Sequence, residues 1–166
     1  MSEWAKGKKE AGKEAREMEK LIDGYSYQDP GHAERTDVKY REMLGEEIGK
    51  VRDFLFPMLE AAYLEDNMDN AGGLQDLMQW VEVLALEMGL KMEWNRDAAY
   101  KNYEKLIKID AALISDMQNL AKAAHQMNED VMKGKAGSVV KRCSEMKQTV
   151  TGIITSFKKR RHSLGG

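Results

Sequence analysis

Apolar residues recur in alternating steps of three and four from residue 103 to residue 131, and this run limits the possible folds most strongly. Such steps place side chains on one face of an α-helix. The pattern predicts one long, coiled-coil-like helix over about 95–132, which at about 1.5 Å per residue would exceed about 50 Å. Its two columns are Leu106, Leu113, Leu120 and Met127, and Tyr103, Asp110, Met117, Ala124 and Val131.

The positions beside these columns carry isoleucine and alanine where a two-stranded coiled coil usually carries charges. A stripe this wide is typical of a bundle, so we expect an all-α, antiparallel bundle of four to five helices. Residues 74–88 are also apolar around most of a predicted helix. We therefore expect a second copy or a protein partner to cover part of this surface. The interface candidates are Leu106, Leu113, Met117, Leu120 and Met127.

Several local signals predict where helices begin and end, and one segment is ambiguous between helix and strand. Thr36 or Asp37 is a candidate N-cap for a helix that follows, and residues 66–73 form a predicted polar turn. Pro57 predicts a kink, or the start of a new helix, because proline lacks the amide hydrogen. The spacing over 139–157 favours a helix, although the β-branched run 149–155 leaves a strand as the alternative.

These patterns divide the 166 residues into three parts. Residues 1–24 form a charged helical arm, residues 36–157 form the bundle domain, and residues 158–166 form a basic, disordered tail. The segment between arm and bundle contains Asp-Pro-Gly, which is typical of a loop.

Asp110 is the one carboxylate within the long apolar stripe, and two explanations are open. A lysine or arginine on a neighbouring helix can pair with it, or a bend can leave it in contact with water. Alternatively, it is a polar residue that fixes the register of the helices.

Charge is distributed unevenly along the chain. Residues 133–166 carry nine basic side chains and one acidic side chain, whereas residues 21–132 are strongly acidic. A basic end can neutralise the acidic body of its own chain or of a copy, or it can bind an external polyanion such as a nucleic acid or an anionic membrane surface. The polyanion-binding candidates are Lys141, Arg142, Lys147, Lys158, Lys159, Arg160 and Arg161.

Catalytic and metal-binding motifs have little support. None of the three histidines has a glutamate three residues before it, so the sequence predicts no metal site and no cofactor. Cys143 lies on an apolar face, which predicts a buried thiol. Two acidic clusters leave a Mg²⁺-dependent phosphohydrolase as a remote alternative. Their members are Glu42, Glu46 and Glu47, and Glu65, Asp66 and Asp69.

The sequence therefore predicts a non-catalytic helical interaction or scaffold subunit that self-associates or joins a multi-protein complex. The alternative is a small nucleic-acid-binding subunit that uses the basic segment 133–161. We expect a cytoplasmic protein, because no apolar run is long enough for a transmembrane helix or a signal peptide and a single cysteine forms no internal disulfide.

Overall fold

A computed structural model describes residues 3–89 and 95–165, and within these ranges the chain forms helices and no strands. Residues 1, 2 and 166, which belong to the predicted arm and tail, lie outside this description. The helices are α1 (Glu3–Leu21), α2 (Pro30–Leu64), α3 (Met68–Gly89), α4 (Arg96–Lys101), α5 (Tyr103–Met132) and α6 (Val139–Ser163). The all-α prediction is confirmed, and the segment 149–155 is helical.

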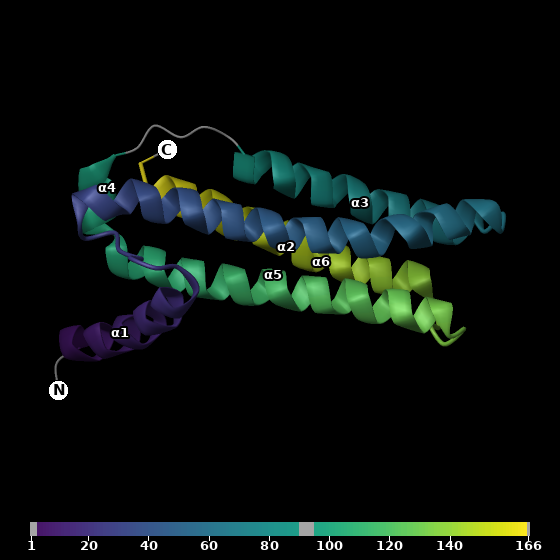
Figure 1. Cartoon of the computed structure of the whole chain (residues 1–166), viewed down its shortest axis with the longest axis horizontal. Coiled ribbons are helices and arrows are strands. Elements are labelled where there is room, and N and C mark those ends of the chain that lie inside the picture. Colours follow the sequence, from purple (N-terminus) through teal and green to yellow (C-terminus); the bar gives the residue numbers. More distant parts are fainter. Residues whose placement is uncertain (1–2, 90–94, 166) are drawn as a thin grey trace.

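The four long helices lie side by side along the long axis of the molecule (Figure 1). Helices α2 and α3 form one antiparallel hairpin, and α5 and α6 form another. Helix α2 packs against both α3 and α5, and α6 packs against the same two helices. Helices α2 and α5 start at the same end of the molecule, so they run parallel to each other (Figure 1).

The wide stripe on α5 is buried within the single chain, which corrects the reason for expecting a partner there. All five interface candidates, Leu106, Leu113, Met117, Leu120 and Met127, are buried. Helix α5 contacts α1, α2 and α6, so three helices cover its apolar surface. Met18 and Ile22, from the end of α1 and the residue after it, belong to the same core. Helix α1 belongs to the predicted arm, outside the predicted bundle domain, so its cover over α5 was not expected.

Helix α2 begins earlier than predicted. The side chain of Asp29 accepts a hydrogen bond of 2.9 Å from the backbone N–H of Gly31, and Pro30 occupies the first turn. Asp29 is therefore the N-cap, a role in which aspartate followed by proline is favourable, and Thr36 and Asp37 lie buried inside the helix.

Pro57 does not end α2, which is continuous from Pro30 to Leu64. Pro57 is exposed, as is Asp53, whose carbonyl loses its helical partner. A solvent-facing proline is tolerated because water can hydrogen-bond that carbonyl. The polar turn is also shorter than predicted, since α3 already begins at Met68.

The long predicted helix is interrupted, and the predicted tail is ordered up to Gly165. Asn102 separates α4 from α5, and its side-chain amide donates a hydrogen bond of 3.1 Å to the carbonyl of Ser163. The backbone N–H of Asn95 donates to the carbonyl of Leu164, which is itself buried. These bonds hold the end of α6 against α4, which corrects the prediction of a disordered segment from residue 158.

Candidate functional site

A buried ionic cluster lies at the end of the molecule where α2 and α5 begin. The side chains of Arg160, Asp37 and Asp110 are each 0% exposed. Arg160 donates from Nε to Asp110 Oδ1 and from Nη1 to Asp37 Oδ1, both at 2.6 Å. The guanidinium therefore joins α6 to α2 and α5 in one place. Two carboxylates surround one cation, and Arg41, at the edge of the cluster, pairs with Asp37 at 3.1 Å.

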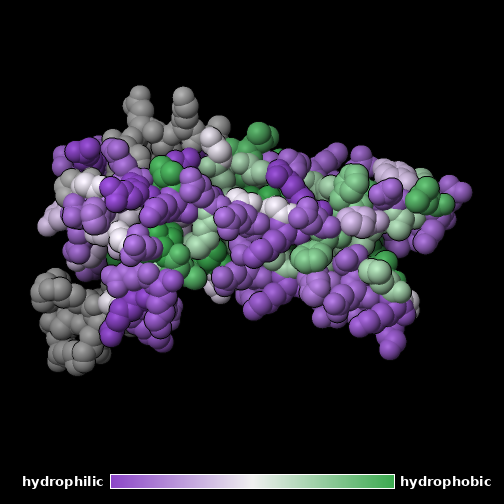
Figure 2. Space-filling model, in the orientation of Figure 1, coloured by the Kyte–Doolittle hydropathy of each residue, from purple (hydrophilic) through white to green (hydrophobic). Residues whose placement is uncertain are grey.

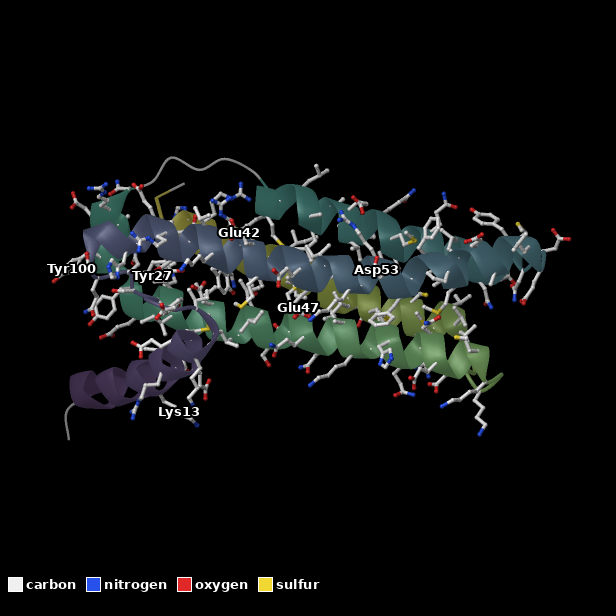
Figure 3. All side chains as sticks on the ribbon, in the orientation of Figure 1. Lys13, Tyr27, Glu42, Glu47, Asp53 and Tyr100 are labelled. Atoms are coloured by element: carbon white, nitrogen blue, oxygen red, sulfur yellow. The ribbon has the colours of Figure 1, made fainter. Side chains whose placement is uncertain are left out.

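Tyrosines complete the cluster. The hydroxyls of Tyr25 and Tyr27, in the loop before α2, both donate to Asp110 Oδ2, and Tyr27 also accepts a bond of 2.8 Å from Arg160 Nη2. Figure 3 labels Tyr27 where this loop passes beside the start of α2. Tyr40 donates to the backbone carbonyl of Asp110 at 2.8 Å, and its ring lies against the Arg160 guanidinium at 4.5 Å. We call Tyr25, Tyr27, Asp37, Tyr40, Asp110 and Arg160 the ionic cluster.

Burial changes the pKa values of this cluster. Desolvation is the largest cause for Asp110 and raises the pKa of its carboxyl, although Arg160 and the tyrosine hydroxyls oppose the change. Desolvation also raises the pKa values of Tyr25, Tyr27 and Tyr40, with the negative charge of Asp110 adding to the effect. The tyrosines therefore remain protonated donors, and Asp110 accepts their hydrogen bonds.

The sequence revealed only part of this cluster. Asp110 stood out within an apolar stripe, and the expectation of a basic partner on a neighbouring helix is confirmed by Arg160. A role in fixing register stays a prediction. The prediction that Arg160 belongs to a disordered tail is wrong, because this residue lies in α6 and its side chain is buried. Tyr25 and Tyr27 were missed because a loop without periodicity gives no signal of burial.

Most of the seven polyanion-binding candidates contact carboxylates of their own chain. Arg142 pairs with Asp130 and Lys147 with Asp76, each at 2.9 Å, and Arg161 pairs with Glu87. Arg160 pairs with Asp37 and Asp110, so four of the seven cations have carboxylate partners within the chain. Lys141, Lys158 and Lys159 remain exposed and form no ion pair with another residue in the described ranges. The basic end therefore neutralises part of its own acidic body.

The opposite end of the molecule exposes large apolar side chains. Leu64 and Met68 flank the turn between α2 and α3, and Met132 ends α5; Leu64 and Met132 are each 80% exposed. Tyr63 and Val140 lie nearby on α2 and α6 and are partly exposed. Figure 2 shows hydrophobic side chains at the surface of this right-hand end. We call Tyr63, Leu64, Met68, Met132 and Val140 the apolar tip.

The acidic residues that suggested a phosphohydrolase do not form one site. Glu42 lines a groove of about 370 Å³ between α2 and α3, whereas Glu47 lies on the side of α2 that faces α5 and pairs with Lys50 at 3.0 Å. Figure 3 shows these two side chains at separate places along α2. Glu65, Asp66 and Asp69 are exposed at the apolar tip. Within residues 3–89 and 95–165, no three His, Cys, Asp or Glu side chains cluster as metal ligands.

Cys143 is a buried residue of the core, as predicted. Desolvation raises the pKa of its thiol to about 11, and the nearby Arg142 opposes this only in part. At neutral pH the thiol is therefore protonated and a poor nucleophile.

Comparisons with protein families, with curated proteins and with solved structures find no match to this chain. Among the described helices, none combines the length and the apolar character that crossing a bilayer requires.

Proposed function

We propose that this chain is a non-catalytic helical interaction subunit that binds its partner through the apolar tip. The observation that carries the proposal is the exposure of large apolar side chains from both helical hairpins at one end of the molecule. Exposed apolar side chains that gather in one place mark contact sites more often than isolated ones do. The α5 stripe, which first suggested an interface, is occupied by the chain's own helices.

The apolar tip is also held in a fixed shape. The N–H of Asn67 donates to the carbonyl of Ala62 at 2.9 Å, which closes the turn after α2. The N–H of Lys135 donates to the carbonyl of Asp130 at 2.8 Å, which closes the end of α5. Fixed turns favour binding, because less conformational entropy is lost when a partner docks.

Site-specific photo-crosslinking in the native host tests this proposal. A photoreactive amino acid replaces Leu64, which is exposed, so the fold does not depend on the original side chain. The control carries the same amino acid at Gln148, an exposed polar position on α6. We expect adducts of defined mass at Leu64 and few at Gln148. Equal crosslinking at both positions would contradict binding through the apolar tip.

A second candidate function, polyanion binding, has one supporting observation. Lys108 and Lys159 line a groove of about 280 Å³ between α5 and α6, together with Ile109 and Ser156. Lysines beside a groove can bind phosphate groups, and such binding weakens steeply with salt. If this function is correct, replacing Lys158 and Lys159 with glutamate abolishes salt-dependent binding of RNA or DNA. The matched change at Lys133 and Lys135 does not.

A further inference from the structure

We infer that the partner of the apolar tip is a second copy of this chain, bound end to end around a two-fold axis. This inference rests on the proposed function and names its partner. One end of the molecule carries a group of acidic side chains, a group of basic side chains and two hairpins of unequal length. A second copy, rotated about a two-fold axis, complements all three features.

The charges at this end are divided between the two hairpins. The turn of the α2–α3 hairpin carries Glu65, Asp66 and Asp69, and no lysine or arginine occurs between residues 53 and 90. The α5–α6 hairpin carries Lys133, Lys135 and Lys141 around its connection. All six side chains are exposed, and none forms an ion pair with another residue of the described chain. We call the two groups the acidic tip and the basic tip.

The two hairpins also differ in how far they extend along the long axis of the molecule. Figure 1 shows that the α2–α3 hairpin extends further than the α5–α6 hairpin at the right-hand end. A Cβ added to Gly73 would lie 3.4 Å from the Cα of Val140, so the start of α6 lies beside the second turn of α3. The first turn of α3, with Met68, therefore projects past the start of α6 and leaves a step.

A two-fold axis perpendicular to the bundle matches these features. Rotation by half a turn places the acidic tip of one copy opposite the basic tip of the other, twice per dimer. The same rotation fits the projecting hairpin of each copy against the recessed hairpin of its partner. Leu64 directly precedes Glu65 of the acidic tip, and Met132 directly precedes Lys133 of the basic tip, so the same docking brings both apolar side chains to the second copy. Closed two-fold contacts of this kind are the commonest form of self-association.

The contact is small, so we expect a weak and reversible dimer. Sedimentation of the full chain up to about 1 mM measures its dissociation constant. Replacing both Leu64 and Met132 with serine weakens dimerisation at least about tenfold. Leu86→Ser is the control, because Leu86 is a comparably exposed leucine on α3 away from the tip. Its dissociation constant stays that of the wild type.

Charge reversal provides the decisive test. One variant carries Glu65→Lys and Asp69→Lys, and the other carries Lys133→Glu and Lys135→Glu. Each variant alone dimerises at least about tenfold more weakly than the wild type, because like charges then face each other. An equimolar mixture of the two regains an affinity within about threefold of the wild type, because opposite charges again face each other. Thermal unfolding of each variant checks that it remains folded.

Two results would overturn the inference. A wild-type chain that remains monomeric up to about 1 mM excludes the dimer, and a mixture that fails to regain affinity excludes this arrangement of the two tips. The proposed function is judged separately by the adducts at Leu64. If those adducts contain a different protein while the chain sediments as a monomer, the interaction function stands and the second copy is excluded. If the dimer forms but Leu64 gives no specific adduct, the apolar tip is not the contact.

Discussion

At the scale of single residues, Arg160 does what no other side chain of the ionic cluster can do. Its planar guanidinium reaches Asp37, Asp110 and the hydroxyl of Tyr27 from three different nitrogens. A lysine offers one nitrogen and lacks this geometry. Because Asp110 is removed from water, it depends on this arginine for a compensating charge, whereas Asp37 also pairs with Arg41.

Replacing Arg160 with alanine removes the cation that pairs with the buried carboxylate of Asp110, and it leaves Asp37 with Arg41. We expect this change to lower the free energy of unfolding by about 3–5 kcal/mol, the usual result of breaking a buried ion pair from one side. Lys159→Ala is the matched control, because Lys159 is adjacent and exposed, and its effect stays within about 0.5 kcal/mol. Urea unfolding followed by circular dichroism measures both. A loss below about 1 kcal/mol for Arg160→Ala would show that the cluster does not stabilise the fold.

At the scale of helices, periodicity predicted more than the local end signals did. The three-and-four spacing identified the apolar faces of α5 and α6, because burial on one face is imposed along the whole helix. The ends depended on single side chains whose role the pattern does not show. Asp29, which belongs to the segment predicted as a loop, caps α2, and Ser138 caps α6 by accepting from the N–H of Lys141.

The interruption at Asn102 and the order at the end of α6 escaped prediction for a related reason. Both depend on bonds between residues more than 60 positions apart, as in the amide of Asn102 and the carbonyl of Ser163. Such contacts carry no periodic signal. The same holds for the candidate site, where Asp110 could be noticed but its partners could not be named.

Two glycines give a test of local backbone preference. Gly45 lies inside α2 with open space where a Cβ would be, so Gly45→Ala raises the free energy of unfolding by about 0.5–1 kcal/mol. Gly137 has a φ of 61°, in the left-handed region, so Gly137→Ala lowers the free energy of unfolding by about 1–2 kcal/mol. Urea or thermal unfolding measures both variants, and the change in the free energy of unfolding has opposite signs for the two. Changes of the same sign would mean that Gly137 relaxes to another conformation or that Gly45 is more crowded than the structure shows.

At the scale of the whole molecule, the two ends are built differently. The end with the ionic cluster removes its polar groups from solvent and joins the loop before α2 to α2, α5 and α6. The other end places apolar and charged side chains in solvent. Because only one end exposes an apolar and charged contact surface, we expect that end to face the partner in an assembly.

Alkaline pH should weaken the whole fold through the buried tyrosines. Because the fold raises the pKa values of Tyr25, Tyr27 and Tyr40, their contribution is complete below the pKa of about 10 of an unfolded tyrosine and is lost as pH rises above it. Each such tyrosine lowers the free energy of unfolding by up to about 1.4 kcal/mol per pH unit in that range. Urea unfolding between about pH 9 and pH 11, with tyrosinate absorbance, measures the slope.

The control for this measurement is Tyr100→Phe, since Tyr100 is exposed, and we expect the same slope in this variant as in the wild type. Tyrosinate absorbance from all six tyrosines in a chain that stays folded would contradict the structure of the ionic cluster.

The order of the ionic cluster along the chain has a consequence for protein synthesis. Both tyrosines of the loop and both carboxylates are translated before Arg160, which is the cation that pairs with Asp110. A nascent chain that has reached only the end of α5 therefore holds the carboxylate of Asp110, which it cannot bury without a large desolvation penalty. The ion pair that compensates Asp110 therefore forms only after α6 has been synthesised, which makes closure of this end of the bundle a late step of folding during translation.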